Sequence, residues 1–193
     1  MRNRVLGILA GLFFFGAGGA VAQVVWDSPL LVPPRVSGGV GIFLIDPAGG
    51  DLGVMGTWRS GNLGLRVGLA EDVRDDLSIF GGVDFTGLIT RASNDFPLDV
   101  AWVAGAGIGI GDDALLSFPL GISLGRGFDA DGARFTPYAT PRVVLDAFFG
   151  DDSDLDLDLA VDLGLDIAFQ PGWMIRFGAT IGDRDALAIG VVF

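Results

Sequence analysis

The sequence predicts an all-β fold, a closed antiparallel up-and-down β-barrel that crosses a membrane with about ten strands. In the stretch 154–169, every odd position from Leu155 to Phe169 is apolar, and aspartate recurs at the even positions. Successive side chains of a strand point to opposite faces, so this stretch forms a strand with one apolar and one acidic face. Hydrophobic residues make up 50% of the chain, yet no stretch after Ala22 is apolar for the roughly 18 residues that a spanning helix needs. A membrane barrel accounts for both the high apolar content and the missing spanning helix, because its apolar residues alternate with polar ones along each strand.

The N-terminus has the layout of a secretory signal peptide. Two arginines within the first four residues precede an apolar run over 5–15, and the small residues Ala20-Val21-Ala22 follow. We therefore expect a signal peptide at 1–22, cleaved before Gln23. A membrane-anchoring helix is the alternative, which the short, glycine-containing apolar run disfavours. The chain has no cysteine, which excludes a lipoprotein anchor, disulfides and thiol catalysis.

The remaining chain is expected to form one domain. Residues 23–35 hold three prolines and are predicted to be an irregular N-terminal lead-in. Residues 36–193 are predicted to form the barrel, because segments of period two follow one another to the end. The predicted strands are 36–45, 51–59, 63–70, 77–86, 98–110, 116–124, 135–147, 154–169, 173–181 and 186–193. An even number suits a closed barrel with both ends on one side. Eight strands would result if 36–45 or 135–147, the less regular segments, failed together with a neighbour.

The predicted connections fall into two chemical sets. Counting strands alternately places the acidic connections on one rim, here called the acidic rim, which we expect to face the cell exterior: 46–51, 71–76, 111–113, 150–153 and 182–185. The opposite rim holds 59–62, 87–96, 126–133 and 170–172. No confident metal site and no cofactor are predicted. Loose binding of divalent cations, or bridging of lipopolysaccharide, is an alternative to a simple solvated rim at the paired acids Asp112, Asp113, Asp151 and Asp152.

Aromatic residues gather on the apolar faces of the predicted strands, near the opposite rim. A ring of aromatic residues at the headgroup level is typical of membrane barrels. The sequence therefore predicts an aromatic girdle of Trp58, Phe85, Phe135, Phe169, Trp173 and Phe193.

The inner face is predicted to carry a lumen charge cluster. Its members are Asp84, Asp99, Asp146, Asp156, Asp158, Asp162 and Asp166 with Arg66, Arg142 and Arg176. Two acids about 7 Å apart on one strand face repel by about 2 kcal/mol at an effective dielectric near 20. Counting back from the 170–172 turn sets Arg176 opposite Asp166, and places Arg142 near Asp158 and Asp162. We therefore expect a lumen largely plugged by salt bridges, with a narrow cation-preferring channel as the alternative.

Composition also excludes several functions. The formal net charge is −12, with 24 acidic and 12 basic residues, which disfavours nucleic acid as a partner. The chain has no histidine, on which the hydrolase sites known in similar barrels depend, so we expect no enzyme. The glycine-rich stretch 105–111 lies inside a predicted strand instead of opening a helix, and is expected to make room in the lumen rather than to bind a nucleotide.

The chain ends on Phe193, with Leu187, Ile189 and Val191 alternating before it. This ending resembles the terminal strand of bacterial outer-membrane proteins, which the barrel-assembly machinery recognises. With the signal peptide and the strand pattern, the mature chain resembles small outer-membrane barrels of the OmpA, OmpX and opacity-protein type. The resemblance implies a Gram-negative outer-membrane location, contact with outer-membrane lipid and lipopolysaccharide, and a structural or envelope-stabilising role. Ten strands are too few for porin-like general diffusion.

A rival of another class has the opposite orientation of the two faces. In a soluble periplasmic lipid-binding barrel, the leucines of 154–169 would turn inward and the aspartates outward. The glycine and alanine residues among these aspartates favour a confined lumen and therefore the membrane barrel.

Overall fold

The computed structural model describes residues 26–72, 77–110, 114–149, 154–170 and 172–193. Within these ranges the chain forms strands and irregular segments and no helix. None of the described residues belongs to a helix long and apolar enough to cross a membrane. The expected signal peptide at 1–22 and its cleavage site lie outside the described residues.

Eleven strands are present in the described ranges. Their bounds are β1 Gly39–Asp46, β2 Gly50–Ser60, β3 Leu63–Asp72, β4 Leu77–Thr90, β5 Asp99–Ile110, β6 Ala114–Gly125, β7 Phe128–Ala130, β8 Ala133–Phe149, β9 Asp154–Gln170, β10 Trp173–Gly182 and β11 Ala186–Val192. The ten long strands coincide with the ten predicted ones, and the eight-strand alternative is wrong. The short strand β7 pairs only with β8 and lies in a predicted connection.

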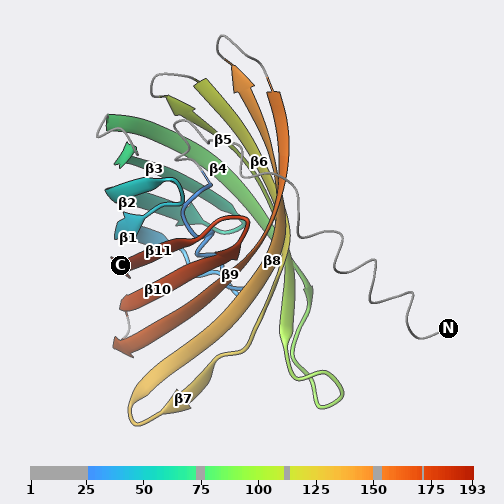
Figure 1. Ribbon diagram of the computed structural model, residues 1–193. Helices are drawn as coiled ribbons and strands as arrows, with labels where there is room; N and C mark the ends of the chain where they lie inside the picture. Colours follow the sequence, from blue (N-terminus) through green and yellow to red (C-terminus); the bar gives the residue numbers. More distant parts are fainter. Residues whose placement is uncertain (1–25, 73–76, 111–113, 150–153, 171) are drawn as a thin grey trace, which may run out of the picture.

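The ten long strands pair antiparallel in chain order and form a closed barrel (Figure 1). Strand β6 pairs with β8, the next long strand, and not with the short β7. The pairing of β1 with β11 closes the ring. At the closing seam the backbone N–H of Phe193 donates to Val40 O at 2.8 Å, and the N–H of Val40 donates back at 3.0 Å. These bonds close the sheet and leave no free edge along the seam. The prediction of an all-β closed barrel is therefore confirmed.

The two faces of the strands are oriented as the alternation predicts. On β9, the side chains of Leu155, Leu157 and Leu163 are 69%, 61% and 44% exposed on the outer surface. Asp162 and Asp166 on the same strand are buried inside, 1% and 7% exposed. The inward-leucine orientation that a soluble lipid-binding barrel requires is therefore wrong.

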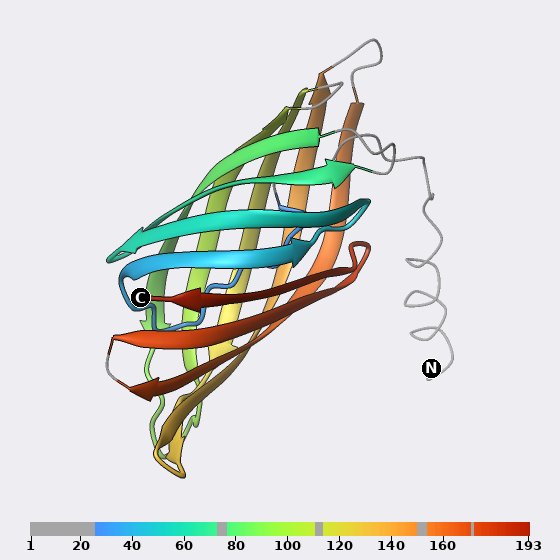
Figure 2. The same cartoon turned by 90° about the vertical axis from the view of Figure 1, so that its left-hand side faces the viewer.

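The barrel wall is much taller on one side than on the other. Strands β8 and β9 have 17 residues each, whereas β1 has 8 and β11 has 7. Strand β10 ends at Gly182, opposite Ala160 of β9, so residues 154–158 extend beyond it (Figure 2). Asp156, predicted to lie in the lumen, belongs to this extension and is exposed. That prediction was wrong because the alternation shows which face a side chain takes, not how far the neighbouring strand reaches.

The segment before β1 lies inside the barrel instead of leading into it from outside. All nine residues 26–34, here called the luminal segment, are buried, and the chain passes through the interior in both views (Figures 1 and 2). Toward the acidic rim, the carbonyl oxygen of Asp27 accepts a hydrogen bond from the N–H of Ala48 in the β1–β2 turn, at 3.2 Å. At the opposite rim, Arg35 pairs with Asp99 at the start of β5. The segment therefore traverses the lumen.

Tight wall packing generates a first prediction. A Cβ atom at Gly164 of β9 would overlap the ring of Tyr138, which lies opposite on β8, whereas one at Gly56 of β2 would find only Val67 O, at 3.8 Å. We expect Gly164→Ala to lower the free energy of unfolding by about 1–3 kcal/mol, because it overpacks the wall. Gly56→Ala should change it by less than about 0.5 kcal/mol. Urea unfolding of both refolded variants measures the difference, and equal effects would contradict this packing.

Candidate functional site in the barrel lumen

The most regular ion pair of the lumen joins β10 to β9. Arg176 lies directly opposite Asp166 in the register, where the residue count from the 170–172 turn predicts it. The Nε and Nη2 atoms of Arg176 donate to the two carboxylate oxygens of Asp166, each at 2.6 Å. Such a bidentate pair fixes both side chains, and both residues are less than 10% exposed.

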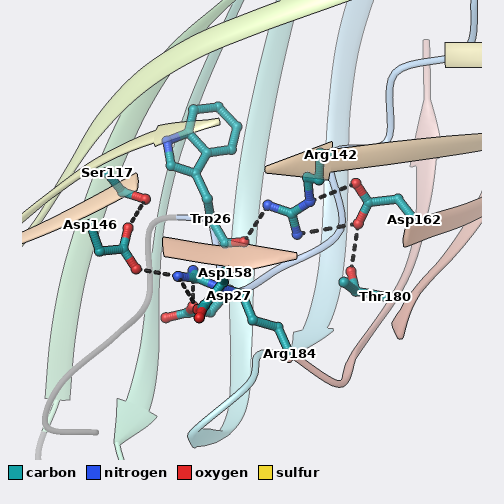
Figure 3. A network of polar contacts seen from close by, with 9 residues as sticks. All are labelled: Trp26, Asp27, Ser117, Arg142, Asp146, Asp158, Asp162, Thr180 and Arg184. Atoms are coloured by element: carbon teal, nitrogen blue, oxygen red, sulfur yellow. Dashed lines mark hydrogen bonds and ion pairs between the residues drawn. The ribbon is translucent and has the colours of Figure 1, made fainter. Parts of the chain in front are cut away.

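A second pair joins β8 to β9. Arg142 donates through Nη2 to Asp162 Oδ1 at 3.2 Å, and its Nε lies 2.9 Å from Oδ2 (Figure 3). The hydroxyl of Thr180 on β10 donates to Asp162 at 2.6 Å. Asp162 therefore bridges three strands. In the register Arg142 lies opposite Ala160, between Asp158 and Asp162, and it pairs with Asp162, whereas Asp158 is bound by Arg184.

Arg184 gathers three carboxylates around one guanidinium (Figure 3). It lies between β10 and β11 and binds Asp27 at 2.6 Å, Asp158 at 2.8 Å and Asp146. Burial alone would lower the pKa of Arg184, but the three carboxylates raise it above its ordinary value. Ser117 of β6 donates to the same Asp146. This cluster ties the luminal segment, through Asp27, to the acidic-rim end of the wall.

The remaining predicted acids also have arginine partners. Asp84 of β4 binds Arg59, and its Oδ2 lies 3.8 Å from Nη2 of Arg66. Asp99 binds Arg35 at 2.7 Å and accepts a hydrogen bond from the N–H of Ala92 at 2.8 Å. Of the seven acids predicted for the lumen, all except Asp156 therefore pair with an arginine. The barrel contains buried Asp/Arg salt bridges, as predicted.

Four partners in these pairs were not predicted: Asp27, Arg35, Arg59 and Arg184. Arg59 and Arg184 were assigned to connections of the rims. Strand alternation could have identified these two arginines as inward. Arg59 lies at an odd position, as does the buried Met55 on β2. Arg184 lies at an even position, as do the buried Arg176 and Thr180 on β10. No comparable signal exists for Asp27 and Arg35, which precede the first strand.

The wall binds the luminal segment through its backbone carbonyls. Arg142 donates to Trp26 O at 2.9 Å, and Arg176 donates to Leu31 O at 2.9 Å. The remaining wall contacts are Arg66 Nη1 to Pro29 O at 3.3 Å, Arg66 Nη2 to Leu30 O at 2.6 Å and Ser123 Oγ to Val32 O at 2.7 Å. Arg66, Arg142 and Arg176 thus each bind the segment while lying within 4 Å of an aspartate.

Side chains of the segment occupy spaces left by wall glycines. A Cβ atom at Gly82 or Gly105 would lie 2.9 Å or 3.0 Å from Cζ2 of Trp26. The guanidinium of Arg66 lies over the same indole, 4.1 Å from the ring centroid, a cation–π contact. A Cβ atom at Gly178 would overlap Leu31 and lie 3.1 Å from Pro29 Cβ. These glycines make room in the lumen, and the space is taken by the chain's own N-terminal segment.

One cavity beside the segment, of about 30 Å³, lies among Leu30, Leu31, Arg66, Asp84 and Arg176, and it has room for a few water molecules. The nine residues of the segment are all buried, so they occupy the lumen along their course.

The predicted girdle residues are on the outer face. Five of them are between 36% and 62% exposed: Trp58, Phe85, Phe169, Trp173 and Phe193. Phe169 and Trp173 lie side by side, with ring centroids 5.8 Å apart. Phe135 is partly buried because it stacks on Phe128, at 5.6 Å.

The terminal strand β11 turns alternate residues outward. Leu187 and Ile189 are 57% and 47% exposed, and Val191 is partly exposed on the same face. Their inward neighbours, Ala188 and Val192, are buried. The residues expected to form the assembly signal therefore share the outer face with Phe193.

The acidic rim is only partly described. Asp112, Asp113, Asp151 and Asp152, where loose divalent binding was considered, lie outside the described residues. Across the parts of the chain that the structure does describe, no group of three or more aspartates or glutamates is placed to hold a metal ion.

Comparison of the sequence with protein-family models gives no match, and comparison with curated proteins gives none either. The function must therefore be argued from the two faces of the barrel wall and from the filled lumen.

The Arg176–Asp166 pair generates a second prediction. Arg176→Leu leaves Asp166 buried without its partner, which should lower the free energy of unfolding by about 3–5 kcal/mol. Adding Asp166→Leu should restore part of this loss. The recovery should be incomplete, because Arg176 also binds Leu31 O.

A double-mutant cycle in urea measures the coupling between the two residues. A coupling energy near zero would contradict the pair. Arg134→Leu with Asp129→Leu is a matched control, because that pair is exposed, with 52% and 76% of the two side chains accessible. Its coupling should stay below about 1 kcal/mol.

Proposed function

We propose that this protein is a bacterial outer-membrane β-barrel with a structural, envelope-stabilising role, whose lumen is sealed by its own N-terminal segment. The observation that carries the proposal is the outer surface of the barrel. Among the described residues, 35 large apolar side chains are exposed. Soluble monomers rarely expose contiguous apolar patches above a few hundred Å², so a surface of this kind is suited to hydrocarbon.

The distribution of charge supports the same environment. The outward positions of β9 from Leu155 to Phe169 carry no charge, and its inward Asp158, Asp162 and Asp166 are paired with arginines. Each long strand of the barrel pairs with a neighbour on both of its edges, because β1 pairs with β11. This pairing satisfies the backbone N–H and C=O groups, for which hydrocarbon offers no partners. The girdle and terminal-strand aromatics on the outer face suit the interface with lipid headgroups.

The filled lumen favours a structural role over transport. A conducting pore needs a continuous aqueous path, and the buried luminal segment passes through the interior where such a path would lie (Figures 1 and 2). The resemblance of the terminal strand to outer-membrane proteins supports delivery by the barrel-assembly machinery. Outer-membrane lipid and lipopolysaccharide are then the partners of the outer face.

A narrow cation-preferring channel is the second candidate. It is favoured by the charge balance at the acidic-rim end of the lumen, where Asp27, Asp146 and Asp158 share the single guanidinium of Arg184. Displacement of the luminal segment would remove Asp27 but leave Asp146 and Asp158 beside Arg184, and cations would enter this end more readily than anions.

Two arginine substitutions on one strand face test the membrane location. Leu163→Arg lies mid-strand on β9 and should cost about 2–4 kcal/mol in lipid, because it places a charge at mid-membrane depth. Leu155→Arg is the matched control at the exposed end of the same face and should cost about 1 kcal/mol or less. Urea unfolding from lipid vesicles gives both values. Equal costs at the two positions would contradict a lipid-covered face.

Planar-bilayer recordings separate the two candidate functions. We expect the purified protein to insert into the bilayer, as judged by heat-modifiable migration of the recovered protein, and to add no conductance. Steady cation-selective conductance of the unmodified protein would refute the sealed lumen and favour the channel.

A further inference from the structure

We propose that the barrel lumen is a binding site for an irregular peptide segment, and that the luminal segment is its ligand supplied by the same chain. The ligand class is a proline-containing segment with an aromatic residue followed by aspartate. This inference concerns the lumen alone and does not depend on what covers the outer face.

The first argument is that the wall recognises backbone. Six carbonyls between residues 26 and 32 accept hydrogen bonds from outside the segment, every one except that of Ser28. Five of the six donors are side-chain groups of Arg66, Arg142, Arg176 and Ser123. Main-chain recognition of this kind gives affinity for a segment of this backbone conformation without depending on every side chain.

The second argument is the match between donors and acceptors. Pro29, Pro33 and Pro34 have no N–H, so three of the nine residues bring carbonyl acceptors into the lumen without bringing donors. The wall arginines supply donors in excess of what their aspartate partners accept. The segment also adds no strand to the sheet. The wall therefore holds the luminal segment mainly through side-chain donors, in the way that a protein holds a bound peptide.

The third argument is that three side chains of the segment have their own places in the wall. The indole of Trp26 packs on the glycines of β4 and β5 and under Arg66, and Leu31 packs on Gly178 of β10. Asp27 is held by Arg184 at 2.6 Å (Figure 3). These three contacts define the sequence preference within an otherwise backbone-directed site.

The fourth argument is the tether. Residues 35–38 join the luminal segment to β1, and Arg35, Ser37 and Gly38 are exposed. A short tether holds its ligand at an effective concentration of about millimolar, which keeps a weaker external peptide out. Cutting the tether should therefore convert an intramolecular contact into ordinary, exchangeable binding.

The test keeps the full chain and cuts it after folding. A protease recognition sequence is inserted between Ser37 and Gly38, the protein is folded, and the inserted sequence is cleaved. A fluorescent synthetic peptide with the sequence of residues 23–35 is then added in excess to the cut and the uncut barrel. We expect saturable uptake by the cut barrel, and at least about tenfold less uptake by the uncut one.

Matched variants test whether the uptake uses the lumen. A peptide carrying Trp26→Ala should bind at least about tenfold more weakly, because it leaves the space on the glycines empty. Ser123→Ala in the barrel removes the donor to Val32 O and should weaken binding about fivefold. Ser60→Ala, at an exposed position of the opposite rim, is the control and should leave binding unchanged.

Three results would overturn the proposal. The first is that the cut, folded barrel takes up no labelled peptide, because the segment is then a fixed part of the wall. The second is that a peptide of scrambled sequence binds equally well. The third is that cleavage unfolds the barrel and the added peptide fails to restore heat-modifiable migration.

Discussion

The structure depends on arginines that serve two partners inside the barrel. Arg66, Arg142 and Arg176 each lie within 4 Å of a wall aspartate and also donate to a carbonyl of the luminal segment. A buried guanidinium without partners would be costly. A single carboxylate partner still leaves some of the five N–H groups of the guanidinium unsatisfied. The segment's carbonyls satisfy further donors, so the wall charges and the luminal segment stabilise each other. Loss of the segment should therefore lower the stability of the wall, and a bound peptide of the same sequence should restore it.

The barrel wall has an apolar outer face and a charged inner face. The outer positions of the strands are apolar and exposed, whereas the inner positions hold charges that are paired instead of hydrated. A barrel of ten strands is too narrow for a wide aqueous pore and too wide to be filled by small wall residues alone. Glycines in the wall leave room, and nine residues of the chain itself occupy it. In a membrane, such a molecule would be stable without forming a leak.

Much of the fold follows from the sequence because strand alternation is a strong, local signal. It predicts the ten long strands, the outward leucines of β9 and the inward Arg176–Asp166 pair. It fails where the chain leaves regular structure. Arg184 lies between two aspartates in a predicted rim connection, where no strand alternation is expected to show which way its side chain points. The luminal segment is bound mainly through carbonyls, which every residue type has, so its sequence carries no periodic sign of its position.

Thiol accessibility tests most directly the central claim that the chain's own N-terminal segment fills the lumen. The chain has no cysteine, so a single introduced thiol reports without background. Ser28 is fully buried in the luminal segment, and Ser37 is exposed in the tether. In the folded protein, Ser28→Cys should be protected from a water-soluble maleimide that rapidly labels Ser37→Cys, and both should react after unfolding. Equal, rapid labelling of the two thiols in the folded barrel would contradict the account.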